Sequence, residues 1–449
     1  MSLSRETLRT APWALAAFAA WALFVRGPYH FDDFVTPLDD PASQGLGAFF
    51  AHLTTTLRPL TKATYALEAS AGLGEMPWAR RLFSCMLHGV GVGLLLALVR
   101  GEAARVRARP GLPTLAVMAY ALHPIHAEAI LALAGRPSLL ASTLLFGALL
   151  AVQRRRDPLG AALFFLACMA RETAIVGLLP LLVLARREGG LGRAMPQIAA
   201  FFCVLPLYVL NARMSTLGRY SLSVVETSEG TPLARQWAAI PVGLSLWLRP
   251  SALSVDHGEA LADSPVAPLA LVGLAILGGG MLLAIAALAK PALARSPLPL
   301  AAALLVAALA PTQSFVFKLD ALTERPFAFA LACVPLALVG LVTWRVHAGL
   351  RGAFSVAAVA AAMLAGLGLR GRGPLYASEV ALWADAAAKS ETNPRPYVNW
   401  IVSLEEAGRP DEALRASRLA RGKFPWDRAL RLTEETYREA AEANKEESR

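Results

Sequence analysis

Two adjacent carboxylates stand in the segment Phe31-Asp32-Asp33-Phe34, between flanking aromatic residues. Either Asp32 or Asp33 could act as a general base, bind a cation or simply solvate a loop. Because close carboxylates resist joint ionisation, we expect a raised pKa within the pair. The flanking phenylalanines favour a position at a membrane interface over open water. The doublet is therefore the candidate catalytic group, with a solvated surface loop as the alternative.

An arginine stands directly before a proline in Leu57-Arg58-Pro59. The planar guanidinium group of Arg58 offers a fork of donors that suits a phosphate. An arginine at the start of a helix can equally anchor that helix to lipid headgroups. The sequence leaves both interpretations of Arg58 open.

A histidine-rich motif follows in His123-Pro124-Ile125-His126-Ala127-Glu128. Imidazoles are common metal ligands, but the two histidines are not spaced one turn apart on a helix, and a helix-breaking proline lies between them. We therefore predict no metal site here, although the spacing would allow a divalent metal. The proline should open the helix near the membrane surface, where ionisable groups commonly mark a substrate path.

Further charged residues lie at other turns between apolar stretches. Arg136 follows Gly135, and the pairs Arg171-Glu172 and Glu324-Arg325 adjoin short apolar segments. Each pair could equally be an internal ion pair that only stabilises packing. Asp256, in Ser254-Val255-Asp256-His257, reads by itself as an ordinary loop.

The composition indicates a membrane protein. The 449 residues are 56% hydrophobic and only 17% charged, against about 25% charge in soluble chains. A net charge of +10 would suggest nucleic acid in a soluble protein. Here the arginines cluster in short runs between apolar segments, as cytoplasmic loops do, so no nucleic acid partner is expected.

About 11 transmembrane helices are predicted from apolar segments of suitable length. They cover residues 11–25, 82–99, 113–131, 138–153, 158–170, 173–185, 195–212, 266–289, 297–311, 326–344 and 353–369. Short basic loops fall at every second connection, which predicts a cytoplasmic N-terminus and an extracytoplasmic C-terminus. All the candidate residues then share the outer side. The hairpin 158–185 is short for two spans, and 237–248 is expected to be re-entrant or interfacial.

The sequence divides into two expected domains, a polytopic membrane domain over residues 1–372 and a helical domain over 373–449. The membrane domain includes a long first outer loop at 26–80. Spacing within 393–427 fits one tetratricopeptide unit of 34 residues, with small residues where paired helices approach. Flanking helices at about 378–391 and 427–445 should cap this unit, because a lone repeat is marginally stable.

Several of these segments, in this order, resemble a known family. The segments FDDF, LRPLTKATYAL, ALHPIHAEAI, ARETAI, LRPSALSVDH and TERPFAFAL, together with the C-terminal unit, look like the transmembrane and tetratricopeptide-repeat O-mannosyltransferases. These are lipid-sugar-dependent glycosyltransferases of the GT-C type. The resemblance implies an all-α, GT-C-like bundle with the acidic pair in its first outer loop. It also implies a donor pocket lined by Arg58, His123, His126, Glu128, Arg136, Glu172, Asp256 and Arg325.

The chain departs from the family pattern at several positions. Arg171 stands where lysine is more usual, Pro137-Ser138 replace alanine-aspartate, and His257 replaces tyrosine. The repeat region is also short. These differences affect the choice of sugar and acceptor more than the class of reaction.

The resulting hypothesis is an inverting glycosyltransferase of a bacterial plasma membrane. It would transfer a sugar, with mannose as the first candidate, from a polyprenyl phosphate to a protein or glycan acceptor outside the cytoplasm. The lipid-linked sugar is the only small-molecule partner expected beyond membrane lipid. A transporter is the alternative from another class, but it predicts two related halves with matching interrupted helices. A scaffold that only presents the repeat unit would need neither the acidic pair nor the basic pocket.

Overall fold

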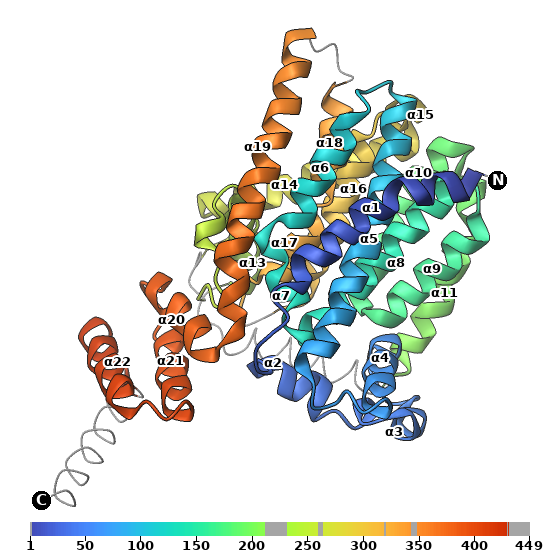
Figure 1. Cartoon of the computed structure of the whole chain (residues 1–449). Helices are drawn as coiled ribbons and strands as arrows, with labels where there is room; N and C mark the ends of the chain where they lie inside the picture. Colours follow the sequence, from blue (N-terminus) through green and yellow to red (C-terminus); the bar gives the residue numbers. More distant parts are fainter. Residues whose placement is uncertain are drawn as a thin grey trace, which may run out of the picture.

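The computed structural model describes residues 2–211, 231–258, 264–317, 320–342, 348–428 and 430, and all regular secondary structure in these ranges is helical. Figure 1 shows a bundle of long helices with a small group of helices beside one end. The longest helices of the bundle are α1 (Ser2–Ala22), α5 (Pro77–Arg105), α8 (Arg136–Gln153), α14 (Pro268–Ala289) and α19 (Ala348–Arg372).

Shorter helices complete the bundle. They are α6 (Gly111–Leu122), α9 (Asp157–Ala170), α10 (Leu178–Glu188), α11 (Met195–Val209), α13 (Pro232–Ser245), α16 (Leu298–Ala310), α17 (Glu324–Ala330) and α18 (Cys333–Val342). Very short helices, among them α2 (Phe31–Asp33), α7 (Ala127–Ile130) and α15 (Pro291–Ala294), lie in the connections, while α3 (Leu46–His52) and α4 (Pro59–Ser70) cover one end of the bundle (Figure 1).

The helical content and apolar length indicate an integral membrane protein. Within the described residues, six helical stretches are long and apolar enough to cross a membrane: Pro77–Arg105, Leu133–Gln153, Leu191–Val209, Pro268–Ala289, Glu324–Leu341 and Val356–Ala377. Each of the eleven predicted spans overlaps a helix, but several of these helices are shorter, so a count of eleven is not confirmed. Most of segment 237–248 lies in α13, which packs along α14, and its re-entrant or interfacial position stays a prediction. Residues 212–230 and 259–263 on either side lie outside the described residues.

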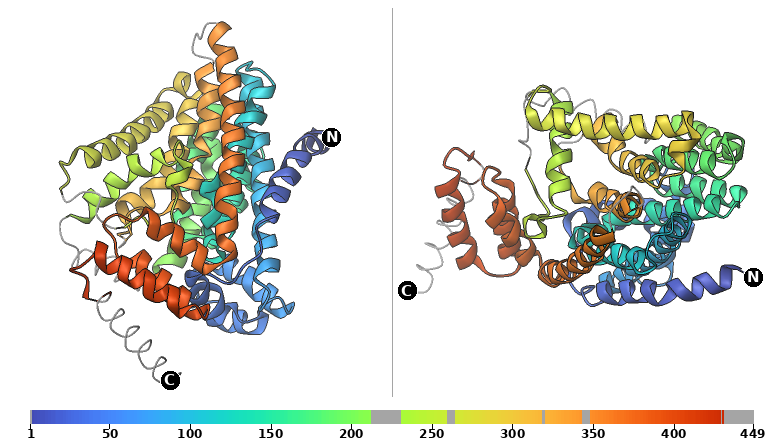
Figure 2. Two further views of the ribbon diagram at one scale, coloured as in Figure 1. Left: turned by 60° about the vertical axis from the view of Figure 1, so that its left-hand side comes forward. Right: turned by 90° about the horizontal axis from the view of Figure 1, so that it is seen from above.

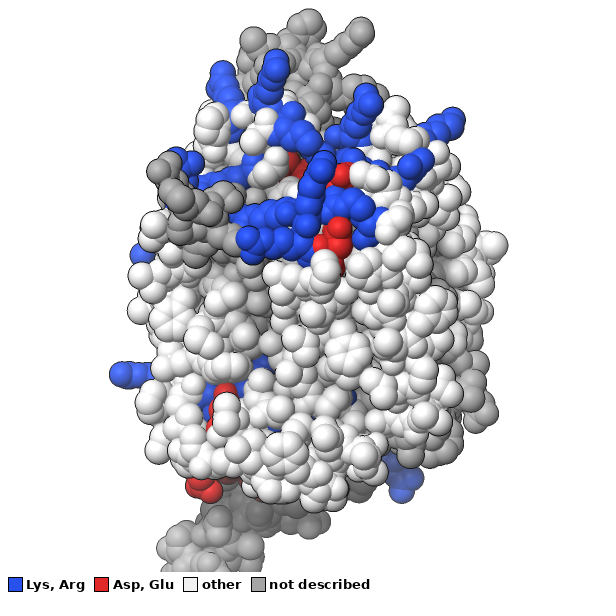
Figure 3. All heavy atoms as spheres, turned by 90° about the vertical axis from the view of Figure 1, so that its right-hand side faces the viewer, with Lys and Arg blue, Asp and Glu red and all other residues white. Residues whose placement is uncertain are grey.

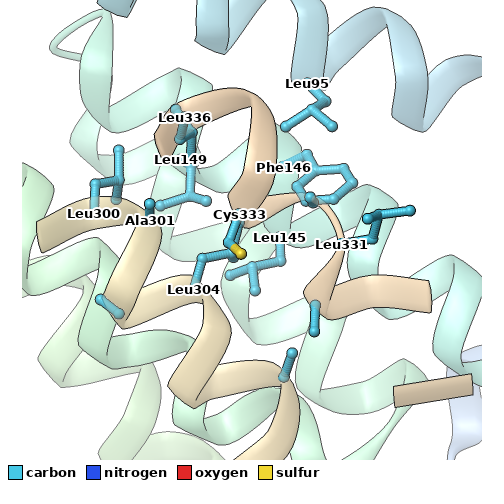
Figure 4. Packing of buried hydrophobic residues seen from close by; sticks show 14 of the residues in the cluster. Leu95, Leu145, Phe146, Leu149, Leu300, Ala301, Leu304, Leu331, Cys333 and Leu336 are labelled. Atoms are coloured by element: carbon cyan, nitrogen blue, oxygen red, sulfur yellow. The ribbon is translucent and has the colours of Figure 1, made fainter. Parts of the chain in front are cut away.

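Apolar side chains of α5, α8, α16 and the α17–α18 region form the centre of the bundle. Figure 4 shows Leu145, Phe146 and Leu149 of α8 beside Leu300 and Leu304 of α16. Within this cluster, side chains of all five are almost completely buried. Burial of this kind between helices leaves the polar connections to form the two ends of the bundle.

The two ends of the bundle differ in charge. Figure 3 shows lysine and arginine side chains crowded around one end, above a belt with few charges. At that end, Arg105 pairs with Glu188 at 3.2 Å, and Arg193 pairs with Asp157 at 2.7 Å. Helix α5 runs from this basic end to the end where α2, α4 and α7 lie (Figure 1). The candidate residues of the first loop are therefore separated from the basic end by the thickness of the bundle.

Three helices form the C-terminal unit beside the bundle (Figure 2). They are α20 (Glu379–Lys389), α21 (Arg395–Glu406) and α22 (Pro410–Lys423), and neighbouring helices pack on each other. Gly408 has φ +69° at the turn between α21 and α22, which suits glycine. Buried Ala413, Ala416 and Ala420 let α22 approach α21 closely. Identification of this pair as a tetratricopeptide unit stays a prediction, and most of the expected helix 427–445 lies outside the described residues.

Candidate functional site

The two carboxylates of the first loop have different surroundings. Asp33 is completely buried, and its two oxygens accept the backbone N–H groups of His30 at 3.1 Å and Ala134 at 2.8 Å. Burial raises the pKa of Asp33 above its ordinary value, against the effect of these hydrogen bonds. The side chain of Asp32 is 46% exposed. Asp33 therefore fixes the loop to the segment before α8, while Asp32 is partly exposed to solvent.

Arg325 connects Asp32 to the histidine-rich segment. Its Nη2 donates to Oδ2 of Asp32 at 3.0 Å, and its Nε lies 2.7 Å from Oε1 of Glu128. The other oxygen of Glu128 accepts the backbone N–H of Glu324 at 3.1 Å. Burial raises the pKa of the Glu128 carboxyl, in opposition to the charge of Arg325. Two predicted site residues from distant segments, Asp32 and Glu128, thus meet at the guanidinium group of a third, Arg325.

Arg58 and Glu172 form a second pair. Nε and Nη2 of Arg58 donate to the two carboxylate oxygens of Glu172 at 2.7 and 2.6 Å. Arg58 adopts a left-handed conformation, φ +62°, directly before Pro59 at the start of α4. Burial would raise the pKa of Glu172, but the paired arginine lowers it to about 2. This bidentate geometry holds the arginine in one orientation.

A pocket lies between α8, α16 and α17. Arg171 and Arg325 contribute charge to its wall, and Arg171 also donates a hydrogen bond to Ser138. Burial, together with the nearby charge of Arg58, lowers the pKa of Arg171 to about 10, which leaves it a cation at neutral pH. The hydroxyl of Thr312, also in the wall, is buried without a hydrogen-bond partner. The rest of the wall is mainly apolar, with Ala141, Leu145, Gly177, Ala307, Ala308, Pro326 and Phe329.

The pocket therefore combines two cations and an unsatisfied hydroxyl with an apolar wall. Arg171, Ser138 and Thr312 were not among the predicted pocket residues. In the sequence, Arg171 was noted as one half of a charged pair and as a departure from the family's lysine, and its neighbour Glu172 in fact pairs with Arg58. Ser138 was noted only as part of a departure from the family pattern, and Thr312 carries no signal in the sequence that separates it from other hydroxyl residues of apolar helices.

The two histidines of the predicted pocket are held in packing contacts. His123 accepts the backbone N–H of Ile125 at 3.2 Å, and its other ring nitrogen lies 3.1 Å from the carbonyl oxygen of Trp247. The His126 ring is buried between His88 and Tyr120, with centroid distances of 4.8 and 4.6 Å. Burial lowers the pKa of both His123 and His126. Among the described residues, no group of three His, Cys, Asp or Glu side chains could hold a metal ion.

Arg136 belongs to a separate buried network. The guanidinium is completely buried, lies 2.7 Å from Oε1 of Glu68, and donates to the backbone oxygen of Arg80 at 2.8 Å. Arg80 in turn pairs with Glu68 at 2.9 Å. The Arg136 cation also lies over the ring of Tyr65, 4.6 Å from its centroid. The structure therefore places Arg136 among core contacts, not in the wall of the pocket.

Asp256 lies where the C-terminal unit meets the bundle. Its Oδ2 is 2.5 Å from Nε of Arg395, and its Oδ1 accepts from the Asn393 amide at 3.0 Å. Arg395 also pairs with Asp320 at 2.6 Å. Asp256 was expected to close the donor pocket, whereas its contacts here attach α21 to the loop after α13.

Two more contacts join the C-terminal unit to the site. Buried Arg372 lies 3.5 Å from Glu324 and 3.2 Å from Asp385 of α20, so two carboxylates balance its charge. Glu324 also accepts the backbone N–H of Ser254 at 2.7 Å. His30, two residues before Asp32, bonds to Glu379 at the start of α20. The C-terminal helices are therefore attached to the segment that carries Asp32 and to the segment that carries Arg325.

Comparison with known proteins gives one informative match. Protein O-mannosyl-transferase Tmtc2 of Drosophila melanogaster is 28% identical over 247 residues, which cover 50% of this chain and 25% of that relative. The chain thus matches about a quarter of the length of this relative. No family model matches the chain, and no solved structure is detectably similar to it. The chain is a distant relative, over half of its length, of a protein named as an O-mannosyl-transferase.

Proposed function

We propose that this protein is an inverting glycosyltransferase that takes a sugar from a polyprenyl phosphate and transfers it to a hydroxyl group of a protein or glycan. The observation that carries the proposal is the position of Arg325. Arg325 lines the pocket, and its guanidinium pairs with the half-exposed Asp32 at 3.0 Å. A phosphate bound in this pocket would therefore lie beside a carboxylate that can reach solvent.

The residues of the pocket match the chemistry of a lipid-linked phosphate, with two cations beside an apolar wall. Arg171 and Arg325 would bind the phosphate oxygens, and the apolar wall would contact the start of the isoprenoid chain. Arg58 is fixed near Arg171 by Glu172 and adds positive potential. The similarity to a protein named as an O-mannosyl-transferase supports mannose as the sugar and a hydroxyl as the acceptor.

Asp32 would act as the base in a single displacement. The acceptor oxygen attacks the anomeric carbon as its proton passes to the Asp32 carboxylate, and the bond from that carbon to the phosphate oxygen breaks. Arg171 and Arg325 would stabilise the charge that grows on the departing polyprenyl phosphate. General-base assistance of this kind contributes about 10²–10⁴ in rate. Asp33, with both oxygens occupied by backbone N–H groups, is not placed to accept this proton.

The proposed sides of the membrane follow from charge. Basic residues gather at one end of the bundle (Figure 3), and α2, which carries Asp32, lies at the other end (Figure 1). The positive-inside rule assigns the basic end to the cytoplasm. The reaction would then take place on the extracytoplasmic side, with the C-terminal unit beside it. The proposed location is a bacterial plasma membrane.

The test is transfer of radiolabelled sugar from a panel of polyprenyl-phosphate donors by the purified protein in lipid nanodiscs. We expect transfer with one donor, a loss of about 10²-fold or more in Asp32→Asn, and unchanged transfer in Asp39→Asn. Asp39 is an exposed carboxylate of the same loop and provides the matched control. Equal activity of Asp32→Asn and wild type would refute the assignment of the base. Absence of transfer from every donor in the panel would count against the reaction itself.

A further inference from the structure

An apolar groove runs along the outer face of the seam between α1 and α5. It is separate from the pocket between α8, α16 and α17. The groove is lined by Ala14, Leu15, Phe18, Leu82, Phe83, Met86, Gly89 and Val90. The wall of the groove has no polar side chain, because every one of these residues is apolar or glycine. In a membrane, such a groove faces hydrocarbon and not water.

Close approach of the two helices at one point shapes the groove. A Cβ atom on Gly89 would lie 2.7 Å from the backbone oxygen of Ala14, so glycine is needed where α1 crosses α5. Beside the crossing, large side chains remain uncovered: Leu15 is 64% exposed, Met86 45% and Val90 47%. A contiguous patch of this kind requires an apolar cover.

An exposed arginine, Arg26, lies at one end of the same seam. One to two turns further toward the Asp32 end, a second hollow is lined by Val25, Arg26, Gly27 and Trp78. Arg26 is exposed and forms no ion pair within the described part of the chain. Trp78 is 49% exposed, and tryptophan is enriched at the level of lipid headgroups. The groove thus passes from hydrocarbon depth to an interfacial tryptophan and an uncompensated positive charge.

We propose that this seam binds one anionic phospholipid. Its acyl chain would lie in the groove between α1 and α5, its phosphate would bind the Arg26 guanidinium, and Trp78 would contact the headgroup region. The Arg26 guanidinium matches the single negative charge of a phosphodiester lipid such as phosphatidylglycerol. The pocket that the proposed function assigns to the donor, with Arg171 and Arg325 in its wall, is lined by other helices, so the two sites are separate.

A second copy of the chain fits this surface less well. Two copies in one membrane share their orientation, so a two-fold axis along the membrane normal would place the same residues at the same depth. Arg26 would then face Arg26 across the interface, and like charges would repel. A lipid with a negative headgroup instead complements this charge.

A lipid bound at this seam would lie next to the junction between α1, the first loop and the C-terminal unit. Gly27, next to Arg26, packs so closely on the chain after α19 that a Cβ atom would lie 2.2 Å from the Tyr376 carbonyl oxygen. The loop that follows leads to Asp32 and to the bond between His30 and Glu379. A lipid at Arg26 would therefore stabilise the junction between α1, the first loop and the C-terminal unit. This inference does not depend on the proposed transferase activity.

Native mass spectrometry of the full chain, released from nanodiscs of phosphatidylglycerol or phosphatidylcholine, tests the site. We expect the wild type to retain one phosphatidylglycerol in preference to phosphatidylcholine. Arg26→Gln should weaken retention of phosphatidylglycerol about fivefold, the contribution of one basic residue at an anionic surface, and Val90→Trp should reduce retention of both lipids by filling the groove. Arg249→Gln, which changes an exposed arginine elsewhere, and Leu23→Trp, which changes an exposed residue just after α1 and outside the lining of the groove, should behave as wild type.

Three results would overturn the proposal. The first is equal retention of the two lipids by the wild type, or no effect of Arg26→Gln, which would remove the headgroup site. The second is displacement of phosphatidylglycerol by an equal concentration of polyprenyl phosphate, which would make the groove a second donor site. The third is efficient disulfide dimerisation of Val90→Cys in membranes, which would show that another copy of the chain covers the groove.

Discussion

From the buried network around Glu68 we predict that one mutation lowers stability in the wild type and raises it in a second variant. Arg80 and Arg136 both pair with this one carboxylate, and the side chains of the three are 1%, 0% and 9% exposed. Arg136→Met leaves Glu68 with Arg80 as partner and removes hydrogen bonds to neighbouring oxygens, so we expect a loss of about 1–3 kcal/mol in the free energy of unfolding. Glu68→Gln leaves two buried cations without a counter-charge, and we expect a loss of about 3–5 kcal/mol.

The double variant separates this reasoning from simple packing. In the Glu68→Gln background, Arg136→Met removes one of two uncompensated cations and should raise the free energy of unfolding. Unfolding by sodium dodecyl sulfate in mixed micelles, followed by circular dichroism, measures all four proteins. Glu75→Gln, an exposed carboxylate nearby, should change stability by less than about 0.5 kcal/mol. Additive losses of stability in the double variant would contradict the proposed charge network. Loss of donor binding by an Arg136→Met protein that remains stable would show that Arg136 takes part in the donor site.

Three further predictions concern the site and its attachments. The paired Glu172 has a pKa of about 2 against an ordinary 4.5, so its stabilisation of about 3 kcal/mol is complete above pH 4.5 and is lost as the pH falls toward 2. The difference in stability between wild type and Glu172→Gln, measured by thermal unfolding, should therefore shrink below pH 4.5. A difference that does not depend on pH would contradict this expectation. Asp33→Asn should lose about 1–3 kcal/mol in detergent unfolding, because its amide nitrogen would face a backbone N–H, whereas Asp32→Asn should keep wild-type stability; equal losses would contradict the distinction. Arg395→Ala should accelerate limited proteolysis between α19 and α20, while Arg409→Ala, which alters only an exposed pair within the unit, should not.

The sequence predicted the helical membrane fold from hydropathy, but not the lengths of its helices. The predicted span 113–131 illustrates the reason. In the structure α6 ends at Leu122, and His123 adopts an extended conformation before Pro124. Hydropathy measures composition along a window and does not register a break in backbone direction. Apolar residues that are buried inside the protein beyond such a break extend the apparent span, as Ile125 and Ile130 do here.

Prediction of the site was uneven because the sequence does not specify the direction of a side chain. Arg136 and Arg171 both stand at the start of a turn between apolar helices, and both seemed suited to a phosphate or an ion pair. Only the fold distinguishes them: Arg136 meets Glu68 in the core, and Arg171 lines the pocket. Asp256 likewise meets Arg395, which lies 139 residues later in the chain. Contacts over such separations are set by packing of whole helices, which no local pattern encodes.

The adjacent residues Glu324 and Arg325 show how structural and functional interpretations of one motif can both hold. Glu324 is completely buried and bonds to the loop before α14 and to Arg372, which leads into the C-terminal unit. Arg325 points to the pocket and to Asp32. Because the two side chains extend from one short stretch of backbone at the start of α17, movement of the C-terminal unit would be transmitted to the guanidinium beside the proposed base. The ion pair between Glu324 and Arg372 that attaches the C-terminal unit and the ion pair between Arg325 and Asp32 at the proposed base are therefore made by adjacent residues of one backbone segment.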